Sequence, residues 1–332
     1  MDDVLEEMWP RVAKELSTAC PGVRLVGLDP LTGGASSLTY IARLDGADDV
    51  VVKVAPPGFE PVRNRDVLRQ AALMRALTDH GGVRVPGVVF AGAGGGLDSP
   101  PFFAMDLVPG RCEEPVLQPV GERAVPAEVE ARAYDAAVAM AELHAVRPGD
   151  LNMEGEARVG IRDEIERWTR AFETVPADLQ GDFQKCAELL EASIPLAMEP
   201  VVNHGDYRLG NTLCSGGRVT AIIDWEIWSL GDPRIDLTWL TFFTDEAGHP
   251  AAEPGAPVGT PTKAELIAAY ETAAGVSLAD MDWFDALTKY KEAAATALLL
   301  KRGRRGGAMP PAMRRMVDGV PRLLDEVRAV LA

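Results

Sequence analysis

The chain has 332 residues, of which 47% are hydrophobic and 25% are charged, and its formal net charge is −17. At about 150 residues per domain, this length predicts two domains or one domain with two lobes. The composition excludes collagen and coiled coils and is typical of a globular protein. The negative charge opposes binding to nucleic acid and to anionic membrane surfaces.

No stretch of the sequence is apolar enough to predict a membrane span. The longest apolar run, Ala293 to Leu300, includes Thr296 and is far shorter than the roughly 20 residues that a span needs. The first residues include Asp2 and Asp3, whereas a secretory signal begins with basic residues. We therefore expect a cytoplasmic protein. Its four cysteines lie far apart in the sequence, which favours buried free thiols over a metal cluster or disulfides: Cys20, Cys112, Cys186 and Cys214.

The first third of the chain predicts a small α+β lobe. Residues 1–18 have the apolar spacing of a helix, and three short β-branched runs at 23–28, 38–44 and 50–54 predict an antiparallel meander. A helix beginning near Val67 should end before Gly81, and two further strands are expected at 85–91 and 102–107. The turn residues 108–110 mark the end of this lobe, which we place at residues 1–107.

The remaining residues, 108–332, predict a larger and mostly helical lobe. Helical periodicity recurs around Ala133 and Ile165, and only residues 200–228 have the pattern of strands. Residues 244–262 are rich in proline and glycine and predict a surface loop.

The strand region carries the residues that predict chemistry. If Gly216 and Gly217 form a two-residue hairpin loop, Asn211 lies opposite Ile222 and diagonally from Asp224 on one face. Diagonal neighbours lie about 7–8 Å apart, so an amide and a carboxylate there can share one hard cation such as Mg²⁺. Asp206, on the loop that enters the hairpin, is placed to take a proton beside that ion.

These motifs resemble those of a known enzyme family. The segments His204-Gly205-Asp206-x-x-x-x-Asn211, Ile223-Asp224-Trp225-Glu226 and Gly231-Asp232-Pro233-x-x-Asp236 are similar to those of the aminoglycoside phosphotransferase family of kinase-like enzymes, over about residues 25–305. The resemblance implies a protein-kinase-like bilobal fold of the α+β class, with a nucleotide-binding lobe at 1–107 and a helical lobe at 108–332. It also implies an ATP-dependent kinase, with GTP as an alternative donor, that uses Mg²⁺ and phosphorylates the hydroxyl of a small molecule.

The resemblance assigns roles to individual residues of the helical lobe. Asp206 would orient or deprotonate the acceptor hydroxyl, and His204 and Arg208 would complete the catalytic loop around it. Asn211 and Asp224 would hold magnesium on the nucleotide phosphates. We expect His204 to brace the loop rather than to act as an acid or base, and Asp232 and Asp236 to cap or brace it as well.

In the small lobe, Lys53 resembles the lysine that binds the α and β phosphates. Its kinase partner is a glutamate on the following helix, where this chain has Gln70, with Asp66 one turn earlier as a substitute. The turn 32–37 would cover the phosphates through Gly33, Gly34, Ser36 and Ser37. Met105, Asp106 and Val108 fall where the family's hinge meets the nucleotide base.

The sequence leaves open which of two classes of acceptor is used, and whether the protein is catalytic at all. The motifs look most similar to the branch of the family associated with acyl-CoA dehydrogenases, which favours a hydroxyacyl or other anionic metabolite. The alternatives are an aminoglycoside or macrolide acceptor, and a non-catalytic, pseudokinase-like nucleotide-binding module, which only Gln70 supports. Basic residues near the C-terminus either cap helix ends or bind an anion: Lys289, Lys291, Lys301, Arg302, Arg304, Arg305, Arg314 and Arg315.

Overall fold

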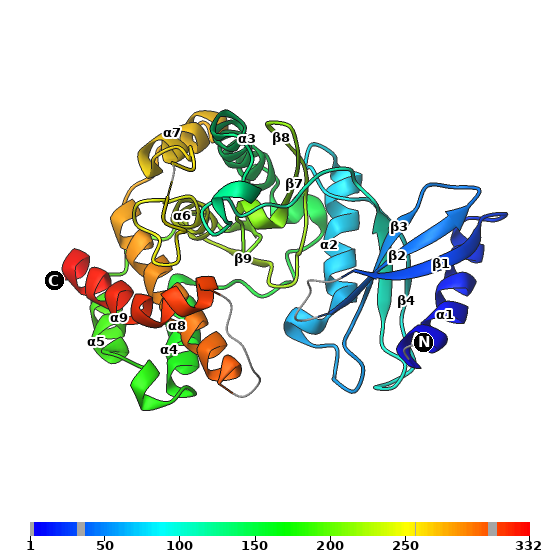
Figure 1. Cartoon of the computed structure of the whole chain (residues 1–332), viewed down its shortest axis with the longest axis horizontal. Helices are drawn as coiled ribbons and strands as arrows, with labels where there is room; N and C mark the ends of the chain where they lie inside the picture. Colours follow the sequence, from blue (N-terminus) through cyan, green and yellow to red (C-terminus); the bar gives the residue numbers. More distant parts are fainter. Residues whose placement is uncertain (1–2, 32–36, 256, 305–310) are drawn as a thin grey trace. The chain divides into compact units, whose positions relative to one another are not determined.

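The structure, a computed structural model, describes residues 3–31, 37–255, 257–304 and 311–332 (Figure 1). The chain divides into two compact units. Unit 1 comprises residues 1–110 and 220–228, and unit 2 comprises residues 111–219 and 229–332. The described helices include none that is long and apolar enough to cross a membrane.

Unit 1 is built on a five-stranded antiparallel sheet in the order β1-β2-β3-β5-β4. Its strands are β1 (Arg24–Leu31), β2 (Leu38–Asp45), β3 (Val50–Val54), β4 (Val88–Gly92) and β5 (Phe102–Asp106). The predicted meander is confirmed, because β1 pairs with β2 and β2 with β3. Every residue of the central strand β3 is buried, which explains its unbroken apolar run apart from Lys53.

Two helices cover opposite faces of this sheet (Figure 1). Helix α1 (Asp3–Ala19) buries Met8, Val12 and Leu16 in a core that includes Val52 and Phe102. Helix α2 (Val67–His80) packs along β4 and β5. Because side chains alternate along a strand, Val52 faces α1 while its neighbour Lys53 points to the other face of the sheet.

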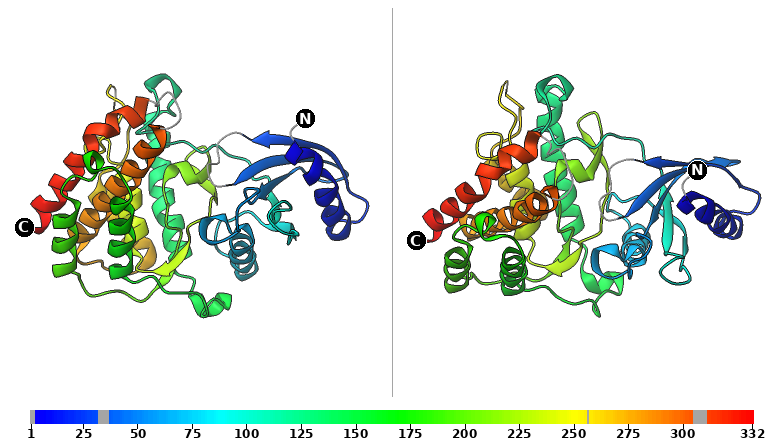
Figure 2. Two further views of the ribbon diagram at one scale, coloured as in Figure 1. Left: turned by 90° about the horizontal axis from the view of Figure 1, so that it is seen from below. Right: turned by 60° about the horizontal axis from the view of Figure 1, so that its bottom comes forward.

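Unit 2 is mostly helical, as predicted. Its helices are α3 (Pro126–His144), α4 (Ile161–Glu173), α5 (Phe183–Ala192), α6 (Arg234–Phe243), α7 (Lys263–Ala274), α8 (Met281–Gly303) and α9 (Pro311–Leu331). Helix α8 packs against α4, α6 and α9, and α4 and α5 lie side by side beside it (Figure 2). Helix α8 thus runs through the middle of the unit 2 core, where Tyr290 and Phe284 are fully buried.

Two small sheets carry the motif residues. β7 (Thr212–Ser215) and β8 (Arg218–Ile222) form the predicted hairpin around Gly216 and Gly217. β6 (Val201–Asn203) pairs with β9 (Ser229–Gly231) in antiparallel register. The sequence reading missed β9, because a strand of three residues is too short to show a periodic pattern.

The predicted surface loop 244–262 is only partly at the surface. Ala251 and Val258 are buried apolar residues, and His249 is 4% exposed. The segment is irregular, as predicted, but some of its side chains pack into the core instead of lying at the surface. Proline and glycine mark irregular backbone, but they do not report whether the intervening side chains pack into a core.

Candidate active site

The catalytic loop of unit 2 runs from β6 to β7 and is held by a buried carboxylate. Gly205 has φ of +86°, a conformation that favours glycine. Asp236 on α6 accepts hydrogen bonds from the backbone N–H groups of His204 (2.6 Å) and Gly205 (2.8 Å). Burial alone would raise the pKa of Asp236, but His144, His204 and these donors outweigh burial and lower it. Asp236 therefore braces the loop as an anion, as predicted.

Asp206 is fixed through both of its carboxylate oxygens. Oδ1 accepts hydrogen bonds from Trp239 Nε1 at 2.6 Å and from Arg208 Nε at 3.3 Å, while Oδ2 accepts one from Asn211 Nδ2 at 2.7 Å. The Asp206 side chain is still 28% exposed. Its carboxylate is thus oriented by the protein and open to a substrate, which is the geometry that a general base needs.

Asn211 is oriented by the same contacts. Its amide nitrogen donates to both the backbone oxygen (2.8 Å) and the carboxylate of Asp206. Because the nitrogen is used in this way, the amide oxygen is the atom left to meet a ligand. An amide oxygen is a suitable ligand for Mg²⁺.

His204 contacts the loop rather than any open surface. The side chain is fully buried, and its Nδ1 accepts a hydrogen bond from the backbone N–H of Asp206 at 3.2 Å. The ring also packs edge-on against Tyr207. These contacts support the expectation that His204 positions Asp206 and does not touch the reacting atoms.

Two acidic partners hold Arg208. Its guanidinium donates to Glu114 Oε2 at 2.7 Å as well as to Asp206, and it lies 5.4 Å from the centre of the Phe243 ring. Glu114 also accepts a hydrogen bond from the backbone N–H of Gly210 at 3.1 Å. Burial raises the pKa of Glu114 although Arg208 opposes the shift. Sequence reasoning missed Glu114, because nothing in its local pattern links it to the loop.

Lys291 on α8 is a second residue that sequence reasoning did not assign to the loop. Its Nζ donates to the backbone oxygen of Gly205 at 2.6 Å and lies 3.8 Å from the centre of the Trp239 ring. Burial lowers the pKa of Lys291, against the negative charges of Glu164, Asp206 and Asp236. Lys291 therefore helps to hold the backbone of the catalytic loop in place.

The other basic residues of the C-terminal cluster mostly have acidic or carbonyl partners. Lys289 bridges Asp285 and Glu326 at 2.9 Å each. Lys301 donates to the backbone oxygen of Thr174, while Arg304 pairs with Asp178 and Arg315 with Glu253. Arg305 lies outside the described residues. These pairs remove the main reason to expect an anion site in the cluster.

Lys53 and Asp224 belong to unit 1 and contact each other. Lys53 Nζ lies 2.6 Å from Asp224 Oδ1, and the Lys53 side chain is only 9% exposed. Neither expected partner meets Lys53: Gln70 donates to the backbone oxygen of Asn64 at 3.3 Å, and Asp66 caps α2 by accepting from the N–H of Arg69. The expectation that one of these two residues holds Lys53 is therefore wrong.

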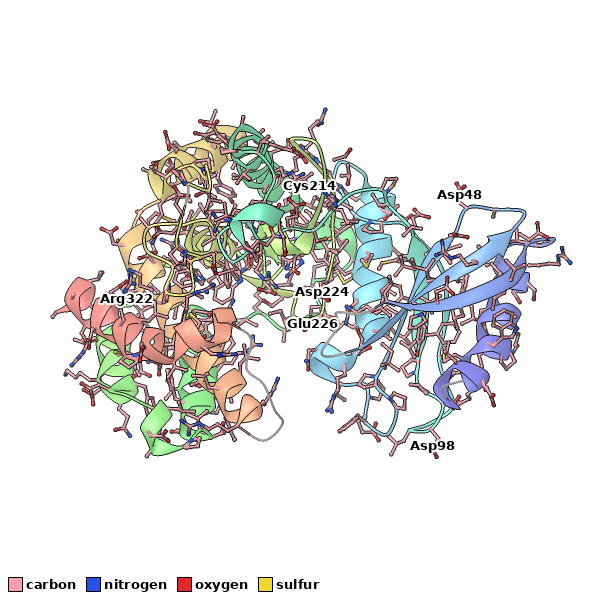
Figure 3. All side chains as sticks on the ribbon, viewed as in Figure 1. Asp48, Asp98, Cys214, Asp224, Glu226 and Arg322 are labelled. Carbon is pink, nitrogen blue, oxygen red and sulfur yellow. The ribbon has the colours of Figure 1, made fainter. Side chains whose placement is uncertain are left out.

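The backbone at Asp224 is unusual. Asp224 has φ of +66°, a left-handed conformation that is uncommon outside glycine and clusters at functional sites. The segment that follows is anchored to α2, because Arg69 stacks 3.7 Å above the Trp228 ring and donates to the Trp228 backbone oxygen. Figure 3 labels Asp224 and Glu226 on this segment. Asn211 belongs to unit 2, so the shared ligation of one ion by Asn211 and Asp224 stays a prediction.

The structure describes only part of the predicted nucleotide contacts. Gly33, Gly34 and Ser36 lie outside the described residues, and Ser37 is buried. Met105 pairs with Val51 inside the sheet, and the backbone N–H of Asp106 donates to Gly87 at 2.9 Å. Val108 lies past the end of β5, and the contact of these three residues with the nucleotide base stays a prediction.

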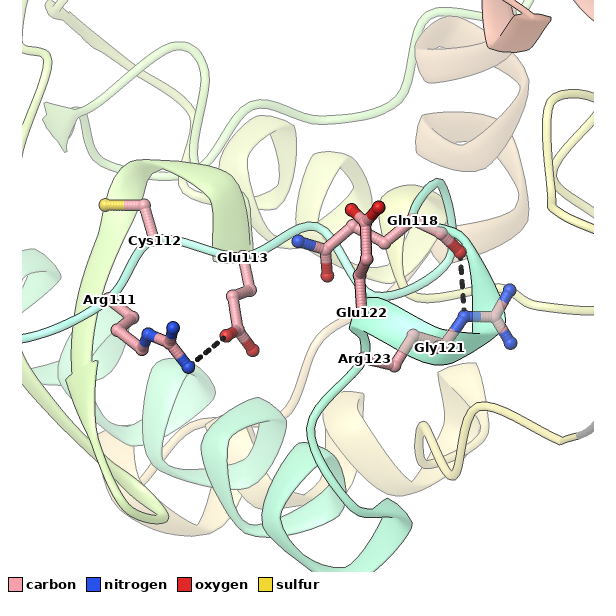
Figure 4. Close-up of a pocket in the computed structure, with 7 residues that line it drawn as sticks. All are labelled: Arg111, Cys112, Glu113, Gln118, Gly121, Glu122 and Arg123. Atoms are coloured by element: carbon pink, nitrogen blue, oxygen red, sulfur yellow. Dashed lines mark hydrogen bonds and ion pairs between the residues drawn. The ribbon is translucent and has the colours of Figure 1, made fainter.

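A cavity of about 600 Å³ lies at the start of unit 2 (Figure 4). It is lined by Arg111, Cys112, Glu113, Gln118, Gly121, Glu122 and Arg123. The backbone of Arg111 pairs with that of Cys214 in β7, so the cavity adjoins the strand that follows Asn211. No sequence pattern predicted this cavity. Cys112 is exposed, which corrects the expectation of four buried thiols, although Cys186 and Cys214 are buried.

Comparison with known proteins agrees with this geometry. The sequence profile of the phosphotransferase enzyme family matches residues 27–287. Acyl-CoA dehydrogenase family member 11 from Pongo abelii is 26% identical over 273 residues, which cover 78% of this chain and 34% of that protein. The chain thus spans about a third of the length of this curated relative.

Solved structures share the fold. A Ralstonia eutropha protein described as a candidate aminoglycoside phosphotransferase has a TM-score of 0.73 at 20% identity, over 99% of this chain and 98% of that one. The GDP complex of aminoglycoside 2'-phosphotransferase-IIIa has a TM-score of 0.63 at 17% identity, over 97% and 98%. The kinase-like α+β fold is therefore confirmed. The chain belongs to the phosphotransferase enzyme family.

Proposed function

We propose that this enzyme transfers the γ-phosphoryl group of ATP to a hydroxyl of a small molecule, with Asp206 as the general base. The observation that carries the proposal is the fixed and partly exposed carboxylate of Asp206, held by Trp239, Arg208 and Asn211. In the proposed step, the acceptor O–H gives its proton to Asp206 while its oxygen forms a bond to phosphorus. The bond from phosphorus to the β-phosphate oxygen breaks, and ADP leaves.

The chain offers residues suited to a magnesium nucleotide. The amide oxygen of Asn211 and the carboxylate of Asp224 are hard oxygen ligands, and Lys53 supplies a positive charge for the phosphates. Magnesium bound there would neutralise the charge on the phosphate oxygens. The protein's own part is alignment: Asp236 and Lys291 hold the backbone of the loop on which Asp206 sits.

For the acceptor, we propose a hydroxyacyl or related metabolite. Curated relatives include proteins of the acyl-CoA dehydrogenase family, and a polycationic acceptor would meet the positive charge of Arg208 beside the base. A second candidate is an aminoglycoside or macrolide, which the names of the structural neighbours favour. The third alternative, a non-catalytic, pseudokinase-like nucleotide-binding module, rests on Gln70 in place of the family's glutamate, and the screen below tests it too.

The test is a phosphate-transfer screen of the purified protein with Mg²⁺ and radiolabelled ATP or GTP. Its acceptor arms are hydroxyacyl-CoA compounds, aminoglycosides, macrolides and choline-like alcohols, and the Asp206→Asn variant is the control. Transfer to an acceptor by the wild type, lost in Asp206→Asn, supports the proposal. Equal transfer by both proteins would refute the role of Asp206. The two nucleotide arms decide between adenine and guanine donors.

A further inference from the structure

Two buried side-chain oxygens of the segment 114–118 have no partner among the residues that the structure describes. Glu114 Oε2 accepts hydrogen bonds from Arg208 and from the N–H of Gly210, but Glu114 Oε1 accepts none. The buried Oε1 of Gln118 is also without a partner. Buried polar atoms are nearly always paired, so two such acceptors in one segment call for a group that donates hydrogen bonds.

The backbone brings these two side chains to one side of a turn. The N–H groups of Leu117 and Gln118 both donate to the backbone oxygen of Glu114, at 2.9 and 3.1 Å. Side chains four residues apart in a turn of this kind lie on the same side. The turn is also anchored, because Val116 is fully buried and its backbone oxygen accepts from the N–H of Glu253 at 2.9 Å. The two acceptors are therefore held in place by the fold itself.

This turn connects the catalytic loop with the cavity at the start of unit 2. Glu113 and Gln118 line the cavity, and the side-chain amide of Gln118 is directed toward Glu113 (Figure 4). Glu114 holds Arg208, whose Nε also donates to Asp206 at 3.3 Å. A single guanidinium group thus joins Glu114 to the proposed base. A molecule in the cavity that reaches Glu114 lies beside the catalytic loop.

The charges around the cavity indicate what kind of molecule it accepts. Arg111 and Arg123 line it together with Glu113 and Glu122, so the charges of the lining balance. Glu113 also pairs with Arg132 on α3, whose side chain is only 6% exposed. The two oxygens without partners are both acceptors, which favours a donor. The balanced charge favours a neutral donor over an ammonium group.

We propose that this cavity is part of the acceptor site, and that Glu114 Oε1 and Gln118 Oε1 accept hydrogen bonds from a neutral group of the acceptor, either a second hydroxyl or an amide N–H. This inference rests on the proposed function and deepens it, because it names the place in unit 2 that holds the acceptor and the polar group that the acceptor presents there.

The first experiment compares Gln118→Leu and Gln118→Glu with the wild type, using 3-hydroxybutyryl-CoA and gentamicin as acceptors. Leucine removes the acceptor oxygen, whereas glutamate keeps it. We expect Gln118→Leu to raise the KM for 3-hydroxybutyryl-CoA about three- to tenfold, the value of one hydrogen bond, and Gln118→Glu to stay within about threefold. The KM for ATP is measured in parallel. Gln184→Leu, the same substitution at an exposed position on α5, is the matched control.

The second experiment measures binding without turnover. Cys112 lines the cavity and is exposed, whereas Cys186 and Cys214 are buried. In a Cys20→Ser background, which removes the partly exposed thiol of unit 1, iodoacetamide should therefore modify Cys112 first. We expect saturating 3-hydroxybutyryl-CoA to slow this alkylation at least about fivefold. The concentration that gives half protection should rise in Gln118→Leu by the same factor as the KM.

The outcomes separate the inference from the proposed function. A higher acceptor KM in Gln118→Leu but not in Gln118→Glu, together with protection of Cys112, supports the inference. An unchanged acceptor KM in Gln118→Leu overturns it, since solvent alone then serves the two oxygens, and an equal rise in the KM for ATP overturns it as well. A KM for gentamicin that falls more than about threefold in Gln118→Glu indicates an ammonium partner and overturns the neutral class.

The two experiments together show which proposal fails. Phosphate transfer to 3-hydroxybutyryl-CoA without protection of Cys112 overturns the inference and leaves the proposed function standing. Protection of Cys112 without phosphate transfer refutes the proposed function, while the cavity is still supported as a binding site.

Discussion

His249 and Glu292 should titrate with opposite effects on stability. Burial lowers the pKa of His249 to about 4, and Arg322 and Arg315 add to the shift while Asp245 opposes it. The ring packs against Phe242 and Phe243, with centroids 4.7 and 5.2 Å away. Its Nδ1 accepts a hydrogen bond from the N–H of Ala251, and its buried Nε2 has no partner among the described residues.

The sign of each effect follows from where the proton binds. Below pH 6.5 the unfolded chain protonates His249 and the folded chain does not, so stability is lost as the pH falls from 6.5 towards 4. Glu292 behaves in the opposite way: the folded chain holds a proton up to about pH 7 that the unfolded chain releases above 4.5. When the pH falls from 7 to 4.5, the shifted pKa of His249 lowers the free energy of unfolding by about 2.5 kcal/mol, and that of Glu292 raises it by a similar amount.

The assay is urea unfolding at pH 7 and pH 4.5 for the wild type, His249→Asn and Glu292→Gln. Asparagine keeps an acceptor for the N–H of Ala251 but does not titrate. Relative to the wild type, acidification should stabilise His249→Asn by about 2.5 kcal/mol and destabilise Glu292→Gln by a similar amount. In the wild type, the effects of His249 and Glu292 on the free energy of unfolding nearly cancel. Each effect therefore becomes visible only in the variant that lacks the other group's effect, that is, in His249→Asn or Glu292→Gln.

The control is His80→Asn, which removes a histidine from an exposed position at the end of α2. This variant shows what replacing a histidine does to stability where the side chain is exposed. If His249→Asn also follows the wild type within about 1 kcal/mol, the reasoning about its buried ring is refuted.

Three further predictions concern catalysis. Asp206→Asn should lower kcat by about 10²–10⁴-fold with nucleotide affinity unchanged in calorimetry, and lost nucleotide binding would contradict its role as base. Trp239→Phe removes the 2.6 Å hydrogen bond to Asp206 and should lower kcat about 10–100-fold, since a bond to a charged group is worth about 1.5–3 kcal/mol. The control for Trp239→Phe is Trp283→Phe, which removes the hydrogen bond from Trp283 Nε1 to Ser193 and should keep the wild-type rate. Asp224→Ala should weaken nucleotide binding measured with Mg²⁺ more than binding measured without it, and an equal Mg²⁺ effect in the variant and the wild type would argue against ligation by Asp224.

The periodic parts of the fold could be predicted from the sequence. Helix α1 and strands β1 to β3 have regular apolar spacing, because each buries one face or, for β3, both faces. Strand β6 falls within the predicted strand region 200–228, but β9 could not be predicted, since a strand of three residues leaves no period to detect. The burial of Ala251 in an irregular segment has no sequence signal either.

Only some residues of the candidate site could likewise be predicted from the sequence. Asp206 and Asn211 lie five residues apart in a recognisable motif, whereas Trp239, Lys291 and Glu114 reach the loop from 33, 86 and 94 residues away. The choice of partner for Lys53 shows the limit most clearly: sequence reasoning looked on the adjacent helix, but Asp224 lies 171 residues further along the chain. Contacts of this kind depend on tertiary structure and have no local pattern.

Helix α6 fixes the catalytic loop with a single stripe of side chains. Asp236, Trp239 and Phe243 lie three and four positions apart, so one helical face supplies the brace, the donor to Asp206 and the ring beneath Arg208. The helical repeat of α6 therefore sets the spacing of these three contacts along the catalytic loop. Inserting one residue between Asp236 and Trp239 would rotate the helix by about 100° and separate the anchor from the other two contacts, although no catalytic residue had been replaced.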